Sequence, residues 1–78
     1  MAKNKLPDNV MPLDAEDLPE VLRWLLYEQE VTMKEISQRA GVSESAMHTW
    51  VHGLNYPRLD LLCYVMDAFG KQLVIIDK

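Results

Sequence analysis

Two histidines at helical spacing are the first residues whose types suggest chemistry. His48 and His52 stand at positions i and i+4, a spacing that places both on one face of a helix and that zinc-binding helices use. The glutamate of the metalloprotease motif does not accompany them, and Cys63 is a distant third ligand at best. We therefore expect no metal here and interpret the pair as part of a polar or solvated helix surface.

Residue types found in catalytic triads are also present, namely Ser43, Ser45, His48 and Asp60. The sequence does not assemble them into a triad, and the serines are explained by helix starts and helix-surface contacts. The chain has no glycine-rich phosphate-binding loop. We expect no enzyme, no catalytic residue and no cofactor.

The serines and histidines lie in a stretch, Thr32 to Asn55, that predicts two short helices joined by a sharp turn. Thr32 and Glu35 form a capping-box pair at the first helix start, and Ser43 is a cap for the second. Gly41 between them can adopt the positive φ that ends a helix. The inward stripes are Met33, Ile36 and Ala40 on the first helix, and Ala46, Met47, Trp50 and Val51 on the second, which Gly53 ends.

This stretch resembles the Cro/CI-type (XRE) helix-turn-helix family. The matching residues, in the family's order and spacing, are Thr32, Glu35, Ile36, Ala40, Gly41-Val42-Ser43, Met47, Trp50, Gly53 and Pro57. The resemblance extends from about Leu22 to Gly70. It implies a mainly α, lambda-repressor-like domain of four helices over residues 14–70 that binds double-stranded DNA.

The resemblance also implies that the outward face of the second helix reads DNA bases. A helix fits the major groove, where serine, threonine and glutamate side chains can contact base edges. His52 and Asn55 fall where the family meets phosphate. The family often has arginine, lysine or glutamine at Glu44 and Thr49, glutamate at Val51 and arginine at Leu26, so this chain departs from its pattern there. The expected DNA-binding residues are Lys34, Ser43, Glu44, Ser45, His48, Thr49, His52, Asn55 and Tyr56.

Charge is distributed unevenly along the 78 residues, whose net charge is −4. The acidic residues gather before the motif, whereas Thr32 to Arg58 holds three lysines and arginines against two glutamates. Phosphate contacts need cations, so this weak positive charge predicts a shallow dependence of DNA binding on salt.

The segments before the motif predict an arm and one more helix. Residues 1–13 contain Pro7 and Pro12 and predict a flexible arm. In the alternative interpretation, this arm reaches a minor groove of DNA through Lys3 and Lys5. Asp17 and Glu20 predict a capping box for the first helix, with Pro19 in its first turn. Leu18, Val21, Leu22, Leu25 and Leu26 form its core stripe, while Trp24 and Tyr27 lie either at the core edge or in a protein interface.

The last helix is predicted over residues 58–69, and Gly70 ends it. We expect Cys63 to be a small buried hydrophobe. The predicted core residues are Leu59, Leu62, Val65, Met66 and Phe69, with Leu61, Tyr64 and Ala68 as a second apolar line.

Residues 71–78 predict a dimerisation strand, because Leu73, Val74, Ile75 and Ile76 are aliphatic, largely β-branched and flanked by charge. No other stretch predicts a strand, so we expect it to pair with a second copy across a dimer axis. A short apolar strand after the last helix also resembles the small dimeric antitoxin-type members of the family.

The leading hypothesis is therefore a sequence-specific transcriptional regulator, a repressor that binds a palindromic operator as a homodimer. The alternative is a protein-interaction module or antitoxin subunit that contacts a toxin or other protein through Trp24, Tyr27 and the acidic first helix. We expect a cytoplasmic location, because the sequence offers no signal peptide or membrane-crossing stretch, and a lone cysteine, Cys63, fits a reducing compartment.

Overall fold

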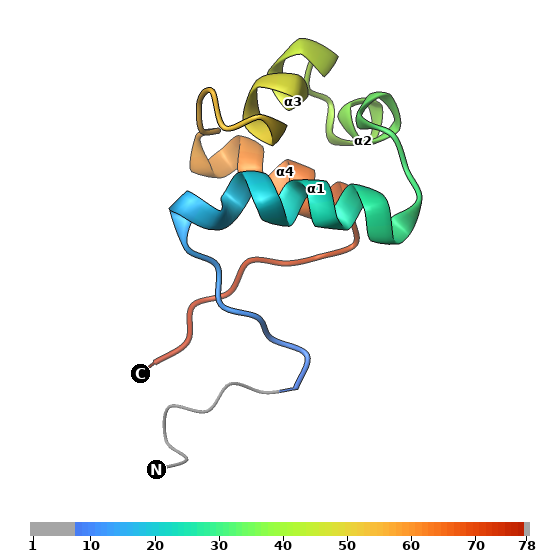
Figure 1. The fold of residues 1–78 in the computed structure, drawn as a ribbon. Coiled ribbons are helices and arrows are strands. Elements are labelled where there is room, and N and C mark those ends of the chain that lie inside the picture. The colour runs from blue at the N-terminus through green and yellow to red at the C-terminus, as the bar shows by residue number, and fades with distance from the viewer. Residues whose placement is uncertain (1–7, 78) are drawn as a thin grey trace.

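The computed structural model describes residues 8–77, which form four α-helices and one short 3₁₀ turn (Figure 1). The mainly α prediction is confirmed, and no β-strand forms within this range. Packing joins α1 to α3, α2 to α3 and α2 to α4. No helix in the described range is long and apolar enough to cross a membrane. The elements are η2 (Ala15–Asp17), α1 (Leu18–Gln29), α2 (Met33–Ala40), α3 (Glu44–Val51) and α4 (Leu59–Ala68).

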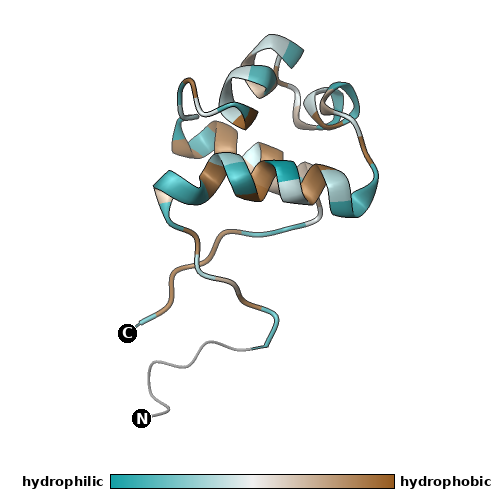
Figure 2. Cartoon of the chain, viewed as in Figure 1, coloured by the Kyte–Doolittle hydropathy of each residue, from teal (hydrophilic) through white to brown (hydrophobic). Residues whose placement is uncertain are grey.

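Hydrophobic and hydrophilic residues alternate along α1 at helical spacing, as the brown and teal bands of Figure 2 show. Leu18, Leu22 and Leu25 are buried, whereas Trp24 and Tyr27 remain 47% and 83% exposed. The predicted core stripe of α1 is confirmed, since its two other members, Val21 and Leu26, are half-buried against the core. Both aromatic side chains thus lie on the surface of the chain, and their place in a protein interface stays a prediction.

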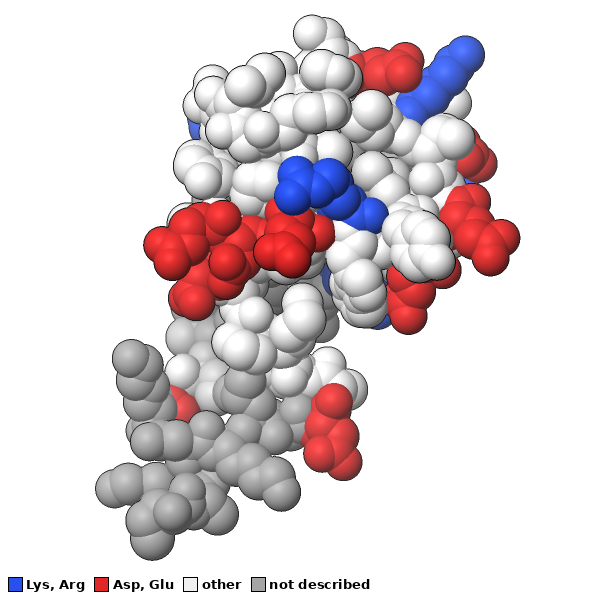
Figure 3. Space-filling model, viewed as in Figure 1, with Lys and Arg blue, Asp and Glu red and all other residues white. Residues whose placement is uncertain are grey.

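The start of α1 differs from the prediction. Asp17 makes no side-chain cap, because it continues the 3₁₀ turn with a helical φ of −91° and ψ of −6° instead of the extended conformation that a cap needs. The turn begins at Asp14, whose carbonyl accepts a hydrogen bond from the Asp17 N–H at 3.0 Å. Acidic side chains gather where α1 begins, near the positive end of its dipole (Figure 3).

The helices α1, α3 and α4 end with the pair of backbone hydrogen bonds that defines the Schellman arrangement, and α2 ends with a variant of it. At the end of α2, the N–H groups of Gly41 and Val42 both donate to the Ser37 carbonyl. Gly41 has φ +76°, as predicted for a glycine that stops this helix. The end of α1 places Glu30 in the same left-handed conformation at φ +55°, and no glycine signals it in the sequence.

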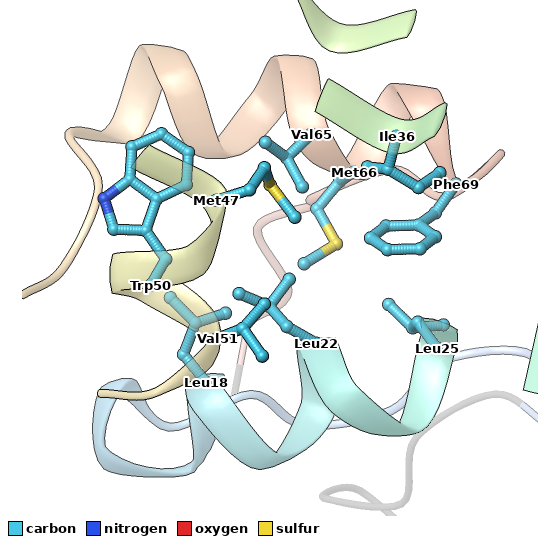
Figure 4. Packing of buried hydrophobic residues seen from close by; sticks show 10 residues of the cluster. All are labelled: Leu18, Leu22, Leu25, Ile36, Met47, Trp50, Val51, Val65, Met66 and Phe69. Atoms are coloured by element: carbon cyan, nitrogen blue, oxygen red, sulfur yellow. The ribbon is translucent and has the colours of Figure 1, made fainter. Parts of the chain in front are cut away.

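Ten buried hydrophobic residues, drawn from all four helices and from Phe69 at the end of α4, form one core (Figure 4). Trp50 is 6% exposed, which confirms the inward stripe of α3. The core consists of Leu18, Leu22, Leu25, Ile36, Met47, Trp50, Val51, Val65, Met66 and Phe69.

Three residues of α4 contradict their predicted burial. Leu59 is 70% exposed and Tyr64 is 56% exposed, and Cys63 is exposed as well. Leu59 lies in the first turn of the helix, one turn before the core-facing stripe begins, and the other two point away from that stripe. Val65 and Met66 are the buried residues of this helix, so the described residues cover α4 on one side.

Both end segments lack regular secondary structure where the structure describes them. Residues 71–77 form no strand within a single chain, so the predicted pairing of Leu73 to Ile76 with a second copy stays a prediction. Leu73 packs against the core, whereas Ile75 is 99% exposed. The predicted arm is described only from residue 8, so the expectation for Lys3 and Lys5 lies outside the described residues.

Candidate nucleic-acid interface

A three-residue connection, residues 41–43, joins α2 to α3 and fixes the angle between them. The Thr32–Glu35 capping box is present at the start of α2, with Glu35 N–H donating to Thr32 Oγ1 at 3.1 Å and Thr32 N–H donating to Glu35 Oε1 at 2.9 Å. Ser43 caps α3 by accepting from the Ala46 N–H at 3.0 Å. Both helix starts are therefore set by the side chains that the sequence predicted.

The capping box also lowers the pKa of the Glu35 carboxyl group. The hydrogen bond from the Thr32 backbone N–H, followed by the Thr32 hydroxyl contact, holds the pKa of Glu35 below its ordinary value of 4.5. Both bonds favour the charged carboxylate. The ionised form of Glu35 thus makes the stronger hydrogen bonds at the start of α2.

The outward face of α3 is polar and accessible. Met47 and Trp50 are buried on the opposite face of the helix, whereas Glu44, Ser45 and His48 are exposed on this one. Thr49 is half-buried at the edge of this face, and exposed His52 directly follows the helix. The structure therefore brings five of the predicted DNA-binding residues onto one surface.

Hydrogen bonds within the helix restrict what two hydroxyl groups can offer a ligand. Thr49 Oγ1 donates to the Ser45 carbonyl at 3.0 Å, so the hydroxyl is left with acceptor capacity and the methyl group remains for apolar contact. Ser43 Oγ acts as an acceptor in its cap and keeps its own proton for donation. Ser43 is thus suited to a phosphate oxygen, and Thr49 to an apolar group or a donor.

The His48 and His52 rings are stacked, with centroids 4.1 Å apart and an interplanar angle of 29°. His52 Nδ1 lies 2.9 Å from the His48 carbonyl oxygen, which orients the second ring. In the part of the chain that the structure describes, no three His, Cys, Asp or Glu side chains are grouped as metal ligands. The stacked pair instead presents a flat, polar surface at the carboxyl end of α3.

Two side chains of α1 hold the ends of other helices, and sequence reasoning did not identify either. The Arg23 guanidinium donates to the Val51 carbonyl at 2.6 Å, and Gln29 Nε2 donates to the Phe69 carbonyl at 2.9 Å. These partners are 28 and 40 residues apart, so no local sequence pattern could reveal them. Arg23 thereby fixes the carboxyl end of α3 on α1.

Positive charge is scarce around α3. The helix itself carries no lysine or arginine, and Figure 3 shows mostly uncharged surface over it. Arg58 is occupied by Asp60 through two hydrogen bonds of 3.1 and 3.2 Å. The same contact lowers the pKa of Asp60. Among the predicted site residues, exposed Lys34 on α2 is the one with a permanent positive charge.

The loop after α3 places the remaining predicted residues. Asn55 Oδ1 accepts from the Tyr56 N–H at 2.8 Å, so the amide group of Asn55 is left to donate outward. Tyr56 is 49% exposed, next to Leu54 at 74%. Neither a model of a known protein family nor a curated protein sequence matches the chain.

Proposed function

We propose that this protein is a sequence-specific DNA-binding regulator of the helix-turn-helix type, in which α2 and α3 form the motif and α3 enters the major groove. The observation that carries the proposal is the polar face of α3, which is exposed opposite a buried face and rigidly placed by the turn at 41–43. A helix held in this way can present its first residues to base edges. The resemblance to the Cro/CI-type family supports the same function.

Each polar group at this surface has a chemical role in the proposal. Ser45 and Glu44 read base edges, with the Glu44 carboxylate accepting from a cytosine amino group. The Thr49 methyl group contacts a thymine methyl, since its hydroxyl proton is already bonded to the Ser45 carbonyl. Ser43, Asn55 and His52 contact phosphates through hydrogen bonds, which position the helix without reading sequence.

The scarcity of positive charge requires that two copies act together. In the proposal the protein is a homodimer whose two α3 helices lie about 34 Å apart, one DNA turn, so that each reads half of a palindromic site. Engaging two half-sites at once raises affinity without additional cations. Occupancy of such an operator represses transcription when it blocks polymerase.

The test is selection of bound sequences from random duplex DNA by the full chain. The expected result is an enriched palindrome whose half-sites are one helical turn apart. Ser45→Ala should then weaken binding to this palindrome by about 1–3 kcal/mol and leave binding to random DNA nearly unchanged. Failure to enrich any sequence, or equal losses on both kinds of DNA, would contradict the proposal.

The second candidate function is a protein-interaction module, for example an antitoxin subunit. The specific observation in its favour is the exposure of Trp24 and Tyr27 on α1, because large aromatic side chains are enriched in protein interfaces. Under this alternative, no DNA sequence is enriched, and Tyr27→Ala abolishes binding of a protein partner while Ser45→Ala does not.

A further inference from the structure

A groove of about 750 Å³ lies on the side of α1 that faces the two end segments. Residues 9–13 form one wall, residues 70–74 and Ile76 form another, and Val21, Trp24 and Leu25 of α1 form the base together with Met66. Figure 1 shows both end segments on the side of α1 away from α2 and α3. None of these residues belongs to the exposed face of α3.

The groove is apolar and incompletely filled. Trp24 is 47% exposed, Met11 56%, Val74 55% and Ile76 43%, although all four line it. Figure 2 shows hydrophobic residues in both end segments as brown stretches of the trace. Among the described residues that line the groove, Lys71 is the only charged one. An acidic or basic partner would find little charge to pair with here.

This chain cannot cover the groove with its own residue Ile75. Val74 and Ile76 on either side of it face the groove, whereas Ile75 does not line it and is 99% exposed. Successive side chains of an extended segment point to opposite sides. Ile75 therefore projects away from its own groove and is available to fill another one.

A second copy of this chain has both the exposed Ile75 and the groove. A twofold axis would make the contact reciprocal, with the Ile75 of each copy in the groove of the other. Five apolar side chains in and beside the groove are 43–99% exposed in one copy, and a stable interface buries roughly 800 Å² per partner including its polar rim. The five side chains are Met11, Trp24, Val74, Ile75 and Ile76. Their exposure and the low charge both fit a dimer interface.

We infer that the groove between residues 9–13, α1 and residues 70–76 is a dimer interface in which Ile75 of each copy inserts against Trp24 and Met11 of the other. The inference rests on the proposed homodimer and assigns the N-terminal segment, residues 9–13, to dimerisation. Backbone pairing of Leu73 to Ile76 alone would not involve Met11 or Trp24. The two arrangements therefore differ in their sensitivity to substitution of these side chains.

The experiment is sedimentation of the full chain at micromolar concentration, with three matched variants. Ile75→Asp and Met11→Asp should each raise the Kd of the dimer at least about tenfold, because each places a carboxylate in an apolar contact. Leu59→Asp is the control, since Leu59 is 70% exposed outside the groove and aspartate suits the first turn of α4. It should leave the Kd of the dimer unchanged.

Tryptophan emission gives a second readout on the same samples. Trp50 is already buried, so a blue shift with rising protein concentration reports burial of Trp24. A monomeric native chain, an unaffected dimer in Met11→Asp, loss of the dimer in Leu59→Asp, or an emission spectrum independent of concentration would each overturn the inference.

Binding to an isolated half-site separates this inference from the proposed function. The Ile75→Asp variant should bind the palindrome no more tightly than an isolated half-site. It should retain the weak affinity of the native chain for one half-site. A native dimer with the expected sensitivities but no DNA binding would leave the interface standing and contradict the DNA-binding proposal. Intact palindrome binding by the Ile75→Asp monomer would contradict the interface's role in DNA binding.

Discussion

The hydroxyl and methyl groups of Thr49 make separable contributions at the residue scale. Thr49→Val should retain most of the affinity for the selected site, because the hydroxyl proton is bonded to the Ser45 carbonyl and the methyl group is kept. Thr49→Ser should lose about 1 kcal/mol, because it removes the methyl group that contacts thymine in the proposed complex. Binding isotherms on the selected duplex check both values. The reverse order would show that the hydroxyl reads the base.

The Glu35 carboxylate gives the fold a defined acid sensitivity. Its folded-state pKa lies below 4.5, so its contribution to stability is complete above that pH and is lost as the pH falls through the folded-state pKa. Glu35→Gln keeps an acceptor oxygen but does not titrate. Urea unfolding at pH 7 and pH 3 should therefore show a smaller loss of stability in Glu35→Gln than in the native chain. Equal losses in the two proteins would argue against the capping box as the cause.

The carboxyl end of α1 is a site of strain at the element scale. Glu30 has φ +55°, where a side chain is disfavoured and glycine is not. Glu30→Gly should raise the free energy of unfolding by about 0.5–1 kcal/mol. Glu28→Gly is the matched control within the helix and should lower it by about 1 kcal/mol. Chemical denaturation measures both, and a destabilised Glu30→Gly variant would contradict the prediction.

The helix α3 packs into the core through Trp50. Its side chain is 6% exposed and packs within the buried cluster, so Trp50→Ala should cost about 3–5 kcal/mol. A domain of this size has little stability to lose, and the variant should unfold or melt far below the native chain. Circular dichroism melting curves check the result. A variant that melts like the native protein would place Trp50 outside the core.

At the scale of the whole molecule, the number of cations in the motif predicts how strongly DNA binding depends on salt. Lys34 and Arg39 are the motif cations without a charged hydrogen-bond partner, since Arg58 is held by Asp60, so a dimer brings about four. A plot of log K against log salt concentration should therefore have a slope of magnitude about 4 or less. DNA-binding titrations between about 50 and 200 mM salt would measure this slope. A slope near 10 would require cations from elsewhere.

Local sequence determined the limits of α2 and the start of α3. The Thr32–Glu35 box, the Ser43 cap and the Gly41 stop act between residues at most five positions apart, so their residue types alone predict them. The outward face of α3 followed in the same way from the spacing of Met47 and Trp50. Glu30 escaped prediction because a glutamate carries no signal for a left-handed conformation.

Only the tertiary structure decided which surfaces remain uncovered. The exposure of Leu59 and Cys63 depends on which faces of α4 the rest of the chain covers, and helical periodicity contains no information about this. Arg23 reaches Val51 across 28 residues, and the groove joins residues 9–13 to residues 70–76, from opposite ends of the described chain. Short-range hydrogen bonding shapes each helix by itself, whereas exposure is a property of how the helices and the end segments pack together.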